Sequence, residues 1–424
     1  MSGADHDPPR RPAGTLVLVA GRDPTVTFSG HSSYVRAQAR AAVLAGYEPH
    51  IFVMAPRTAV LETDFGFVHR MRSPIRPPRQ VLSMLQRPFI VPGICRFLER
   101  RPGSHILHGF GTWADTATHC RDKLRRRGVA VAAIATAYVT AEHEVAAKGA
   151  SRVVEASPTL RLRHRTDLAW TRHVALRFER NAFRSADAIV VNYESVRTML
   201  QEAYGPGLNI RRLAYAAPLA FRDPLAPVPL PRHLEQLGDP AAPLIVSVSR
   251  HDGRKGLDVL IAALAGLRDA GVPFRACLVG PGELLSAHRR LVVSRGLQTR
   301  VSIPGKVPDV LPYLANCDAF VLPSEEEGSG SVSVLEALQV GVPIVASAVD
   351  GIPEDLSHGR NALLVPAGDA PALARTLATL LADPPLKARL CAAARLTYQR
   401  RFAPPVLTQE LAALYNEFGL RPAL

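Results

Sequence analysis

Short apolar runs alternate with helical patterns along most of the chain. Apolar runs flanked by glycine, proline or polar residues predict strands buried on both faces of a sheet. They lie at residues 16–20, 50–54, 106–108, 130–137, 188–191, 244–248, 276–279, 301–303, 319–322, 344–346 and 362–365. Apolar residues recur at helical spacing between many of them, as at 35–43, 194–203 and 257–271. This alternation predicts an α/β protein whose doubly wound parallel sheets are covered by helices on both faces.

A proline-rich stretch divides this pattern in two. The alternation of strands and helices stops at residues 216–243, which hold several prolines, and restarts after them. At 424 residues the chain is also long for one hydrophobic core. We therefore predict two Rossmann-like domains. The predicted segments are a disordered tail at 1–14, a first domain at 15–215, a linker at 216–243, a second domain at 244–395 and a helical end at 396–424 that returns to the first domain.

The chain is strongly basic, with 51 Lys and Arg against 37 Asp and Glu and a formal net charge of +14. The excess is concentrated at residues 70–101, 121–127 and 161–184. A field of this sign attracts nucleic acid, an anionic membrane surface or a phosphorylated substrate. No nucleic-acid-binding motif accompanies it, so we expect no nucleic-acid partner. Contact with a membrane surface and an ordinary solvated basic face both stay open.

Cysteine usage and the first residues indicate the compartment. The five cysteines are scattered and never in metal-ligand spacing, which is typical of reduced cytoplasmic thiols and predicts no metal site. The apolar run at 16–20 is too short for a secretory signal. We therefore expect a cytoplasmic protein, and the basic stretches favour a peripheral place at the inner membrane face.

Residues 321–347 carry the strongest candidate chemistry. An apolar strand ends at Pro323, a loop of small and acidic residues follows, and a helix then runs up to Gly341. A small-residue loop that opens a helix presents free backbone N–H groups, and the helix dipole favours an anion there. Glu336 lies inside this helix, where its carboxylate can accept hydrogen bonds from hydroxyl groups. A phosphate cradle beside a hydroxyl-binding carboxylate is what a nucleotide sugar requires.

Two cations at the start of the second domain fit the same ligand. Arg250 and Lys255 flank a glycine-bearing loop after the strand at 244–248. There a forked guanidinium and an ammonium can clamp a leaving diphosphate. No Asp-x-Asp pair follows the strands of this domain, so we expect these cations, and no metal ion or other cofactor, to hold the diphosphate. Gly280-x-Gly282 is a weak dinucleotide fingerprint that lacks the expected acidic residue further on, which argues against a dehydrogenase.

A set of motifs accompanies these residues. They lie at 248–250 with 255–256, 279–282, 323–324 with 327–328, 335–337 with 341–343, 351–354 and 359–366, and, more loosely, at 185–191 in the first half. Together they resemble the family-4 retaining glycosyltransferases of GT-B fold. That resemblance implies two Rossmann-like domains facing across a cleft, with the acceptor bound by the first and a nucleotide-sugar donor held mainly by the second.

The family's pattern implies roles for individual residues. Catalytic roles, in which a side chain stabilises the leaving diphosphate or contacts the transferred sugar, fall on Arg250, Lys255 and Glu327. Donor-binding roles, in which cations, backbone groups or a carboxylate hold the diphosphate and the ribose, fall on Gly30, Arg250, Lys255, Gly330, Ser331, Val332 and Glu336. Retention of configuration implies a front-face displacement in which the leaving phosphate takes the acceptor's proton.

The chain departs from the family at two positions. The usual pair of glutamates has seven residues between them, and the residue so placed before Glu336 is Gly328 rather than Glu327. We expect the serine-rich loop to bulge by one residue so that Glu327 still reaches the sugar; otherwise that contact is lost. Tyr138 lies where the family often has a histidine, so the usual histidine contact to the sugar is not expected. His108, at another strand end, is expected to be structural.

The resemblance implies a metal-independent retaining glycosyltransferase of hexosyltransferase type. It would move a sugar from a nucleotide-diphosphate sugar, such as a UDP-sugar, to an acceptor hydroxyl in polysaccharide, glycolipid or other glycoconjugate biosynthesis. The arginines of the first domain favour an anionic or lipid-linked acceptor. Two alternatives stay open: a GT-B nucleotide-sugar epimerase, and a catalytically degenerate nucleotide-sugar-binding protein.

Overall fold

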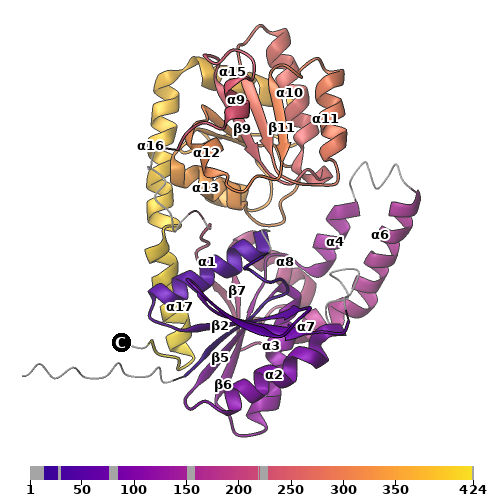
Figure 1. Cartoon of the computed structure of the whole chain (residues 1–424), viewed down its shortest axis with the longest axis vertical. Helices are drawn as coiled ribbons and strands as arrows, with labels where there is room; N and C mark the ends of the chain where they lie inside the picture. The colour runs from indigo at the N-terminus through magenta and orange to yellow at the C-terminus, as the bar shows by residue number, and fades with distance from the viewer. Residues whose placement is uncertain are drawn as a thin grey trace, which may run out of the picture.

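The computed structural model describes residues 14–26, 30–75, 85–149, 158–217, 219 and 228–422. Two lobes are stacked along the long axis of the molecule, each a central sheet with helices around it (Figure 1). The N-terminal lobe holds strands β1 to β8 and the C-terminal lobe strands β9 to β14. Of the predicted tail at 1–14, all but Gly14 lies outside the described residues, and so does most of 218–227 in the predicted linker.

Within the described residues, the N-terminal sheet has the strand order β3-β4-β2-β1-β5-β6-β7-β8, and only the β3–β4 pair is antiparallel. The strands are β1 Leu16–Val19, β2 Pro49–Ala55, β3 Ala59–Thr63, β4 Gly66–Arg72, β5 His105–Phe110, β6 Val131–Thr136, β7 Ala188–Val191 and β8 Ile210–Arg212. The five predicted strands are confirmed. Strands β3, β4 and β8 are not predicted, because strands at or near a sheet edge mix polar with apolar residues and give no buried run.

The C-terminal sheet is parallel throughout, in the order β11-β10-β9-β12-β13-β14. Its strands are β9 Leu244–Val248, β10 Arg275–Val279, β11 Val301–Gly305, β12 Ala319–Leu322, β13 Ile344–Ser347 and β14 Leu363–Val365. Each coincides with a predicted apolar run. The strand order reverses between β9 and β12, and ligands of open α/β sheets bind outside the carboxyl ends of strands at such a switch point.

Helices connect the strands and surround both sheets (Figure 1). In the N-terminal lobe they are α1 Gly30–Leu44, α2 Arg87–Glu99, η2 Gly111–Trp113, α3 Ala114–Arg125, α4 Ala141–Gly149, α6 Pro158–Trp170, the π-helical turn η3 Thr171–Ala175, α7 Leu176–Ser185 and α8 Glu194–Tyr204. In the remainder they are α9 Arg232–Glu235, η5 Gly253–Lys255, α10 Leu257–Asp269, α11 Leu285–Ser294, α12 Leu311–Ala315, α13 Val332–Val340, α14 Ile352–Asp355, α15 Ala370–Ala382, α16 Pro384–Arg401 and α17 Pro404–Glu417. No helix in the described part of the chain is long and apolar enough to cross a membrane.

The last two helices join the lobes. Helix α16 packs on α13, and α17 packs on α1 of the N-terminal lobe (Figure 1). Tyr415 on α17 is fully buried, its hydroxyl accepts from Gln38 at 3.3 Å, and the same oxygen lies 3.1 Å from Nδ1 of His108. Burial lowers the pKa of His108 to about 3, so this histidine is neutral and structural, as predicted. Helix α16 runs without a break across the predicted boundary at residue 395.

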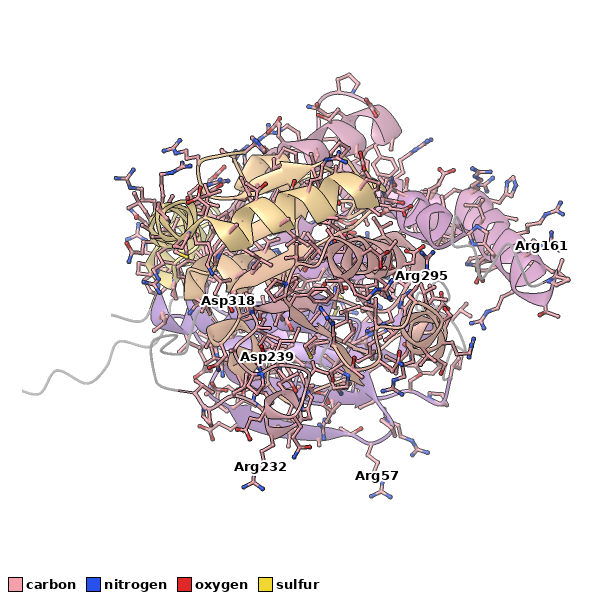
Figure 2. All side chains as sticks on the ribbon, turned by 90° about the horizontal axis from the view of Figure 1, so that it is seen from above. Arg57, Arg161, Arg232, Asp239, Arg295 and Asp318 are labelled. Atoms are coloured by element: carbon pink, nitrogen blue, oxygen red, sulfur yellow. The ribbon has the colours of Figure 1, made fainter. Side chains whose placement is uncertain are left out.

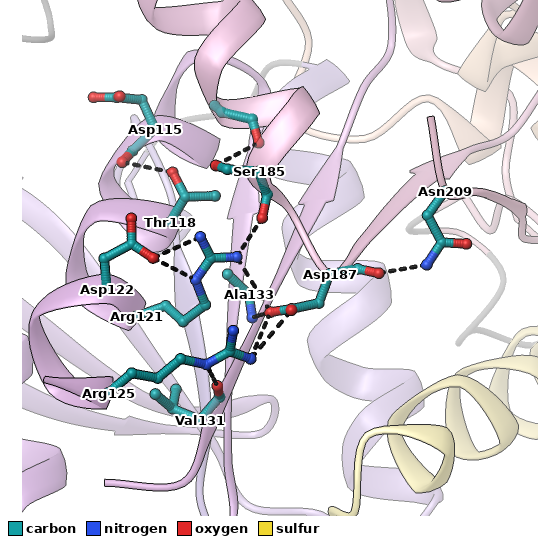
Figure 3. A network of polar contacts seen from close by, with 11 residues as sticks. Asp115, Thr118, Arg121, Asp122, Arg125, Val131, Ala133, Ser185, Asp187 and Asn209 are labelled. Carbon is teal, nitrogen blue, oxygen red and sulfur yellow. Dashed lines mark hydrogen bonds and ion pairs between the residues drawn. The ribbon is translucent and has the colours of Figure 1, made fainter. Parts of the chain in front are cut away.

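Two arginines of the basic stretch at 121–127 stabilise the N-terminal lobe (Figure 3). Asp187, just before β7, accepts from Nη2 of Arg125 at 3.1 and 3.2 Å and from the N–H of Ala133 at 2.7 Å. Arg121 donates to the carbonyl of the residue that ends α7. This network ties α3 to the amino ends of β6 and β7. These charges therefore serve the fold, and they lie at the end of the sheet remote from the candidate site.

Candidate functional site

Two loops meet at the carboxyl ends of β9 and β12: residues 249–256 and residues 323–331. Gly256 has a φ of 56°, and a Cβ there would overlap the backbone of the second loop. Only glycine fits such a close approach at a positive φ. The N–H of Glu325 also donates to the carbonyl of Arg254 at 2.8 Å. Backbone contacts therefore hold together the two parts of the site that the sequence predicts separately.

The Gly280-x-Gly282 pattern has a structural cause. A Cβ on Gly280, whose φ is 145°, would overlap the carbonyl of Ser249, and a Cβ on Gly282 would overlap that of His251. The two glycines thus let the loop after β10 lie against the loop after β9. This packing accounts for both glycines without a dinucleotide.

Lys255 and Glu327 form a nearly dry ion pair. Nζ of Lys255 lies 2.6 Å from Oε2 of Glu327, and the two side chains are 13% and 4% exposed. The Ser324 hydroxyl donates to the other carboxylate oxygen at 2.6 Å. Charges removed from water in this way interact more strongly than at the surface. The structure therefore brings two of the predicted catalytic residues into direct contact.

A strained turn directs Glu327 toward Lys255. Among the described residues other than glycine, only Asp350 has a positive φ, of 46°. Its Oδ2 accepts from the N–H of Glu327 at 2.6 Å and from the N–H of Gly328 at 2.7 Å. Gly328 itself has a φ of 76°. These contacts hold Glu327 against Lys255, and both the expected one-residue bulge and the contact of Glu327 with a sugar stay predictions.

The other cations of the first loop differ in exposure. Arg250 is 55% exposed and pairs with Asp252 at 3.1 Å, so it is the more open of the two predicted cations. Arg254 is only 11% exposed and was not predicted as a site residue. Its position directly before Lys255 in the same loop is the feature of the sequence that could have identified it. Within the described part of the chain, Nε of Arg254 and Oδ1 of Asp252 are buried without a hydrogen-bond partner. Buried polar atoms without a partner are rare in proteins, so these two mark a part of the first loop whose hydrogen bonds are incomplete in the free protein.

Glu336 is a buried carboxyl group on α13. The residue is 8% exposed, and no described residue donates a hydrogen bond to its side chain. Burial, and then the charge of Asp309, raise its pKa to about 8. A largely buried carboxyl group without a protein donor can still accept hydrogen bonds from the hydroxyl groups of a ligand. This environment suits the predicted hydroxyl-binding role.

The opening of α13 lies between the lobes. Ser331 is the N-cap, the helix begins at Val332, and no side chain caps its backbone N–H groups. A Cβ on Gly330 would overlap the hydroxyl of Tyr193, which comes from the turn between β7 and α8. Gly330 is therefore required by a contact with the N-terminal lobe, which no local pattern in the sequence reveals. Gly341, with a φ of 76°, ends the helix as predicted.

The N-terminal lobe also touches the second loop through α4. Nε2 of His143 on α4 lies 2.8 Å from Oε1 of Glu326. A Cβ on Gly328 would lie 2.6 Å from Cγ1 of Val139. The two lobes are therefore in contact across the acidic loop.

Two further polar atoms of the N-terminal lobe lie near this contact. The hydroxyl of Tyr138 and Nε2 of His31 are buried and have no hydrogen-bond partner among the described residues, and their rings meet edge to face at 5.8 Å. His31 is the second residue of α1, which begins at Gly30. Residues 27–29, just before Gly30, lie outside the described residues, so the approach of Gly30 to a diphosphate stays a prediction.

Comparison with known proteins accounts for this arrangement. Residues 242–383 match the model of the glycosyl transferases group 1 family. The chain is 29% identical over 273 residues to alpha-D-kanosaminyltransferase of Streptomyces kanamyceticus, a match covering 64% of this chain and 69% of the relative. It is 31% identical over 261 residues to the GDP-mannose-dependent alpha-(1-6)-phosphatidylinositol monomannoside mannosyltransferase of Mycolicibacterium smegmatis, covering 58% of this chain and 65% of that relative.

Solved structures cover nearly the whole chain. Sucrose-phosphate synthase from Thermosynechococcus elongatus superimposes with a TM-score of 0.74 at 22% identity, over 95% of this chain and 98% of that one. HepE of Anabaena, solved in complex with UDP, superimposes with a TM-score of 0.69 at 18% identity, over 95% of this chain and 100% of that one. The chain therefore has the GT-B fold, and residues 242–383 within its C-terminal lobe match the glycosyl transferases group 1 family.

Proposed function

We propose that this chain is a retaining glycosyltransferase of family 4 that uses a nucleotide-diphosphate sugar and needs no metal ion. The observation that carries the proposal is the Lys255–Glu327 pair, which lies where β9 and β12 end and the loop leading into α13 begins. A cation, a helix opening and the buried carboxyl group of Glu336 match the diphosphate and hydroxyl groups of such a donor.

In this proposal the cations act on the leaving group. Lys255 and Arg250 stabilise the negative charge that develops on the diphosphate, so their contribution is larger in the transition state than in the ground state. Because Lys255 is paired with Glu327 in the free protein, donor binding must rearrange that pair. Glu327 then accepts a hydrogen bond from the transferred sugar, and Glu336 accepts one from the ribose. The leaving phosphate takes the acceptor's proton on the same face, which retains the configuration.

The names of similar proteins support a class of donor and a class of acceptor. One structural neighbour is a UDP complex, and one relative is named as GDP-mannose-dependent, so both nucleotides are candidates. That relative also acts on a phosphatidylinositol mannoside, as its name states. We extend this to an anionic, lipid-linked acceptor in glycoconjugate synthesis, at the cytoplasmic face of a membrane.

Helix α6 favours this acceptor. It projects from the body of the N-terminal lobe (Figure 1), and Figure 2 places Arg161 at its outer end, away from the rest of the molecule. Arg161, Arg163 and Arg165 are exposed, and Leu162 between them is 64% exposed. Exposed arginines with an apolar side chain among them suit an anionic membrane surface.

A donor screen tests the function. UDP- and GDP-linked sugars are compared by thermal shift, since a saturating ligand raises stability by mass action. Stabilising donors are then incubated with vesicles containing phosphatidylinositol, and transfer of the sugar is followed. Transfer supports the proposal. Conversion of the donor into an isomer without acceptor would favour an epimerase, and tight binding without any turnover would favour a degenerate binding protein.

A further inference from the structure

The turn between β7 and α8 is anchored to the C-terminal lobe. The hydroxyl of Tyr193 donates to Oδ2 of Asp355 at 2.7 Å. The N–H groups of Glu194 and Ser195 donate to the two carboxylate oxygens of Glu354 at 2.8 and 2.9 Å. Helix α8 has no side-chain cap from its own lobe, so Glu354 on α14 caps it from across the interface. These bonds form one fixed point between the lobes.

Tyr193 also fills a notch made by two glycines. A Cβ on Gly330 would overlap its hydroxyl, and a Cβ on Gly351 would lie 2.8 Å from its Cδ1. The notch is continuous with the second loop of the candidate site, because the N–H of Gly351 donates to the carbonyl of Ser329 at 3.1 Å. Tyr193 is 3% exposed. A buried side chain of one lobe thus lies directly against the backbone that leads into α13 in the other.

We infer that Tyr193 is a positioning residue that holds the backbone of residues 328–331 in place for the donor diphosphate. Through Tyr193 the conformation of that backbone depends on the position of the N-terminal lobe. This inference rests on the proposed function. Asp355 fixes the hydroxyl, the hydroxyl lies against Gly330, and Gly330 precedes the N-cap of α13. Without the hydroxyl bond the ring loses its anchor, and the loop gains freedom that donor binding must remove. Tyr193 itself touches no substrate in this scheme.

Tyr204, the last residue of α8, provides a matched control. The hydroxyl of Tyr204 donates to Oε2 of Glu179 at 2.6 Å, and Tyr204 is also 3% exposed. Both partners of that bond lie in the N-terminal lobe. Tyr204→Phe therefore removes a buried tyrosine–carboxylate bond of the same kind that does not itself cross between the lobes, and Glu179 keeps the bonds that it accepts from the N–H of Ala141 at the start of α4. A purely stabilising role for Tyr193 predicts the same behaviour in Tyr193→Phe and Tyr204→Phe.

The two variants are compared by donor kinetics. We expect Tyr193→Phe to raise the donor KM about 10-fold, the effect of losing one hydrogen bond to a charged group, while the acceptor KM stays within about 2-fold. Tyr204→Phe is expected to leave both constants unchanged. Glu354→Gln, which weakens the cap of α8, shifts the donor KM in the same direction. Equal donor constants for wild type and Tyr193→Phe would overturn the inference, and so would equal shifts in Tyr193→Phe and Tyr204→Phe.

Amide hydrogen exchange separates this inference from the proposed function. Without any donor, Tyr193→Phe is expected to speed exchange at residues 327–331, whereas Tyr204→Phe is not. If no nucleotide sugar is ever used but exchange responds in this way, the proposed function fails and the coupling stands. If sugars are transferred but exchange and donor KM are unchanged in Tyr193→Phe, the positioning role fails and the proposed function stands.

Discussion

Lys255 Nζ lies 2.6 Å from Glu327 Oε2, so the cation proposed to hold the donor diphosphate is already paired in the free protein. The pair joins the loops after β9 and β12. A diphosphate that enters this site offers Lys255 a second anionic partner and thereby weakens the ion pair between Lys255 and Glu327. The same two residues thus link donor binding to the placement of the carboxylate.

Loss of Lys255 is expected to impair catalysis. Lys255→Ala should lower kcat/KM for the donor by roughly 30- to 1,000-fold, because the transition state loses about 2–4 kcal/mol of charge stabilisation. Initial rates with a competent donor and acceptor measure this. The control is Lys387, whose Nζ lies 3.0 Å from Oδ1 of Asp318, the residue directly before β12. Lys387→Ala should keep near-normal rates. Near-full transfer by Lys255→Ala would remove Lys255 from the mechanism.

The stability of the pair should show strong coupling. Lys255→Met leaves Glu327, whose side chain is 4% exposed, without its cation, and breaking such a buried pair costs about 3–5 kcal/mol. Adding Glu327→Gln removes the unpaired charge, so the double variant should be more stable than Lys255→Met alone. Denaturant unfolding of the wild type, Lys255→Met, Glu327→Gln and the double variant measures the coupling free energy between the two side chains. A purely additive result would mean that the two charges interact weakly in solution.

The pKa of Glu336 predicts a pH dependence. Burial raises it from 4.5 to about 8, so between these pH values the folded protein binds more protons than the unfolded chain. The free energy of unfolding therefore falls as the pH rises through this window, and the loss is complete above pH 8. Glu336→Gln should stabilise the ligand-free protein at pH 8 by on the order of 4 kcal/mol, because each pKa unit between 4.5 and about 8 is worth about 1.4 kcal/mol, with little effect at pH 4.5. Thermal unfolding from pH 4.5 to 9 measures this.

Glu336 should also matter for the ligand. Glu336→Ala is expected to weaken binding of UDP or GDP, whichever the wild type prefers, because the ribose loses an acceptor. Isothermal calorimetry gives the affinity. Unchanged nucleotide affinity in Glu336→Ala would contradict the hydroxyl-binding role while leaving the pH argument intact.

Helix α6 should govern membrane attachment. Reversal of its charges in the triple variant Arg161→Glu, Arg163→Glu, Arg165→Glu is expected to abolish binding to vesicles with anionic lipid at low salt, since each basic residue near the surface contributes about 1 kcal/mol. The control reverses three exposed arginines of the C-terminal lobe, Arg232, Arg290 and Arg375. Vesicle co-sedimentation measures both. Equal losses in the two triple variants would indicate that only the net charge matters.

The sequence by itself determined the two-sheet α/β fold and the strands of the C-terminal lobe. Strands buried on both faces must be apolar throughout, so a continuous run of apolar residues is enough to locate them along the chain. It also predicted Arg250 and Lys255 as site candidates, because loop residues after such strands lie at one edge of a parallel sheet, and Glu336, because it lies in the helix that the next such loop opens. The mixed polarity of β3, β4 and β8 left no comparable local signal.

Only the tertiary structure decided which way Glu327 faces, why residue 330 is glycine, and which arginines stabilise the fold. The spacing to Glu336 could not show whether Glu327 points into the site, because Gly328 has the expected spacing. The direction of Glu327 depends on Asp350, which lies 23 residues away along the chain and accepts a hydrogen bond from the N–H of Glu327. Gly330 depends on Tyr193 in the other lobe, and Arg125 is held by Asp187. Periodicity and turn preferences act over a few neighbouring residues, whereas these outcomes depend on contacts between distant segments that form only when the chain is packed.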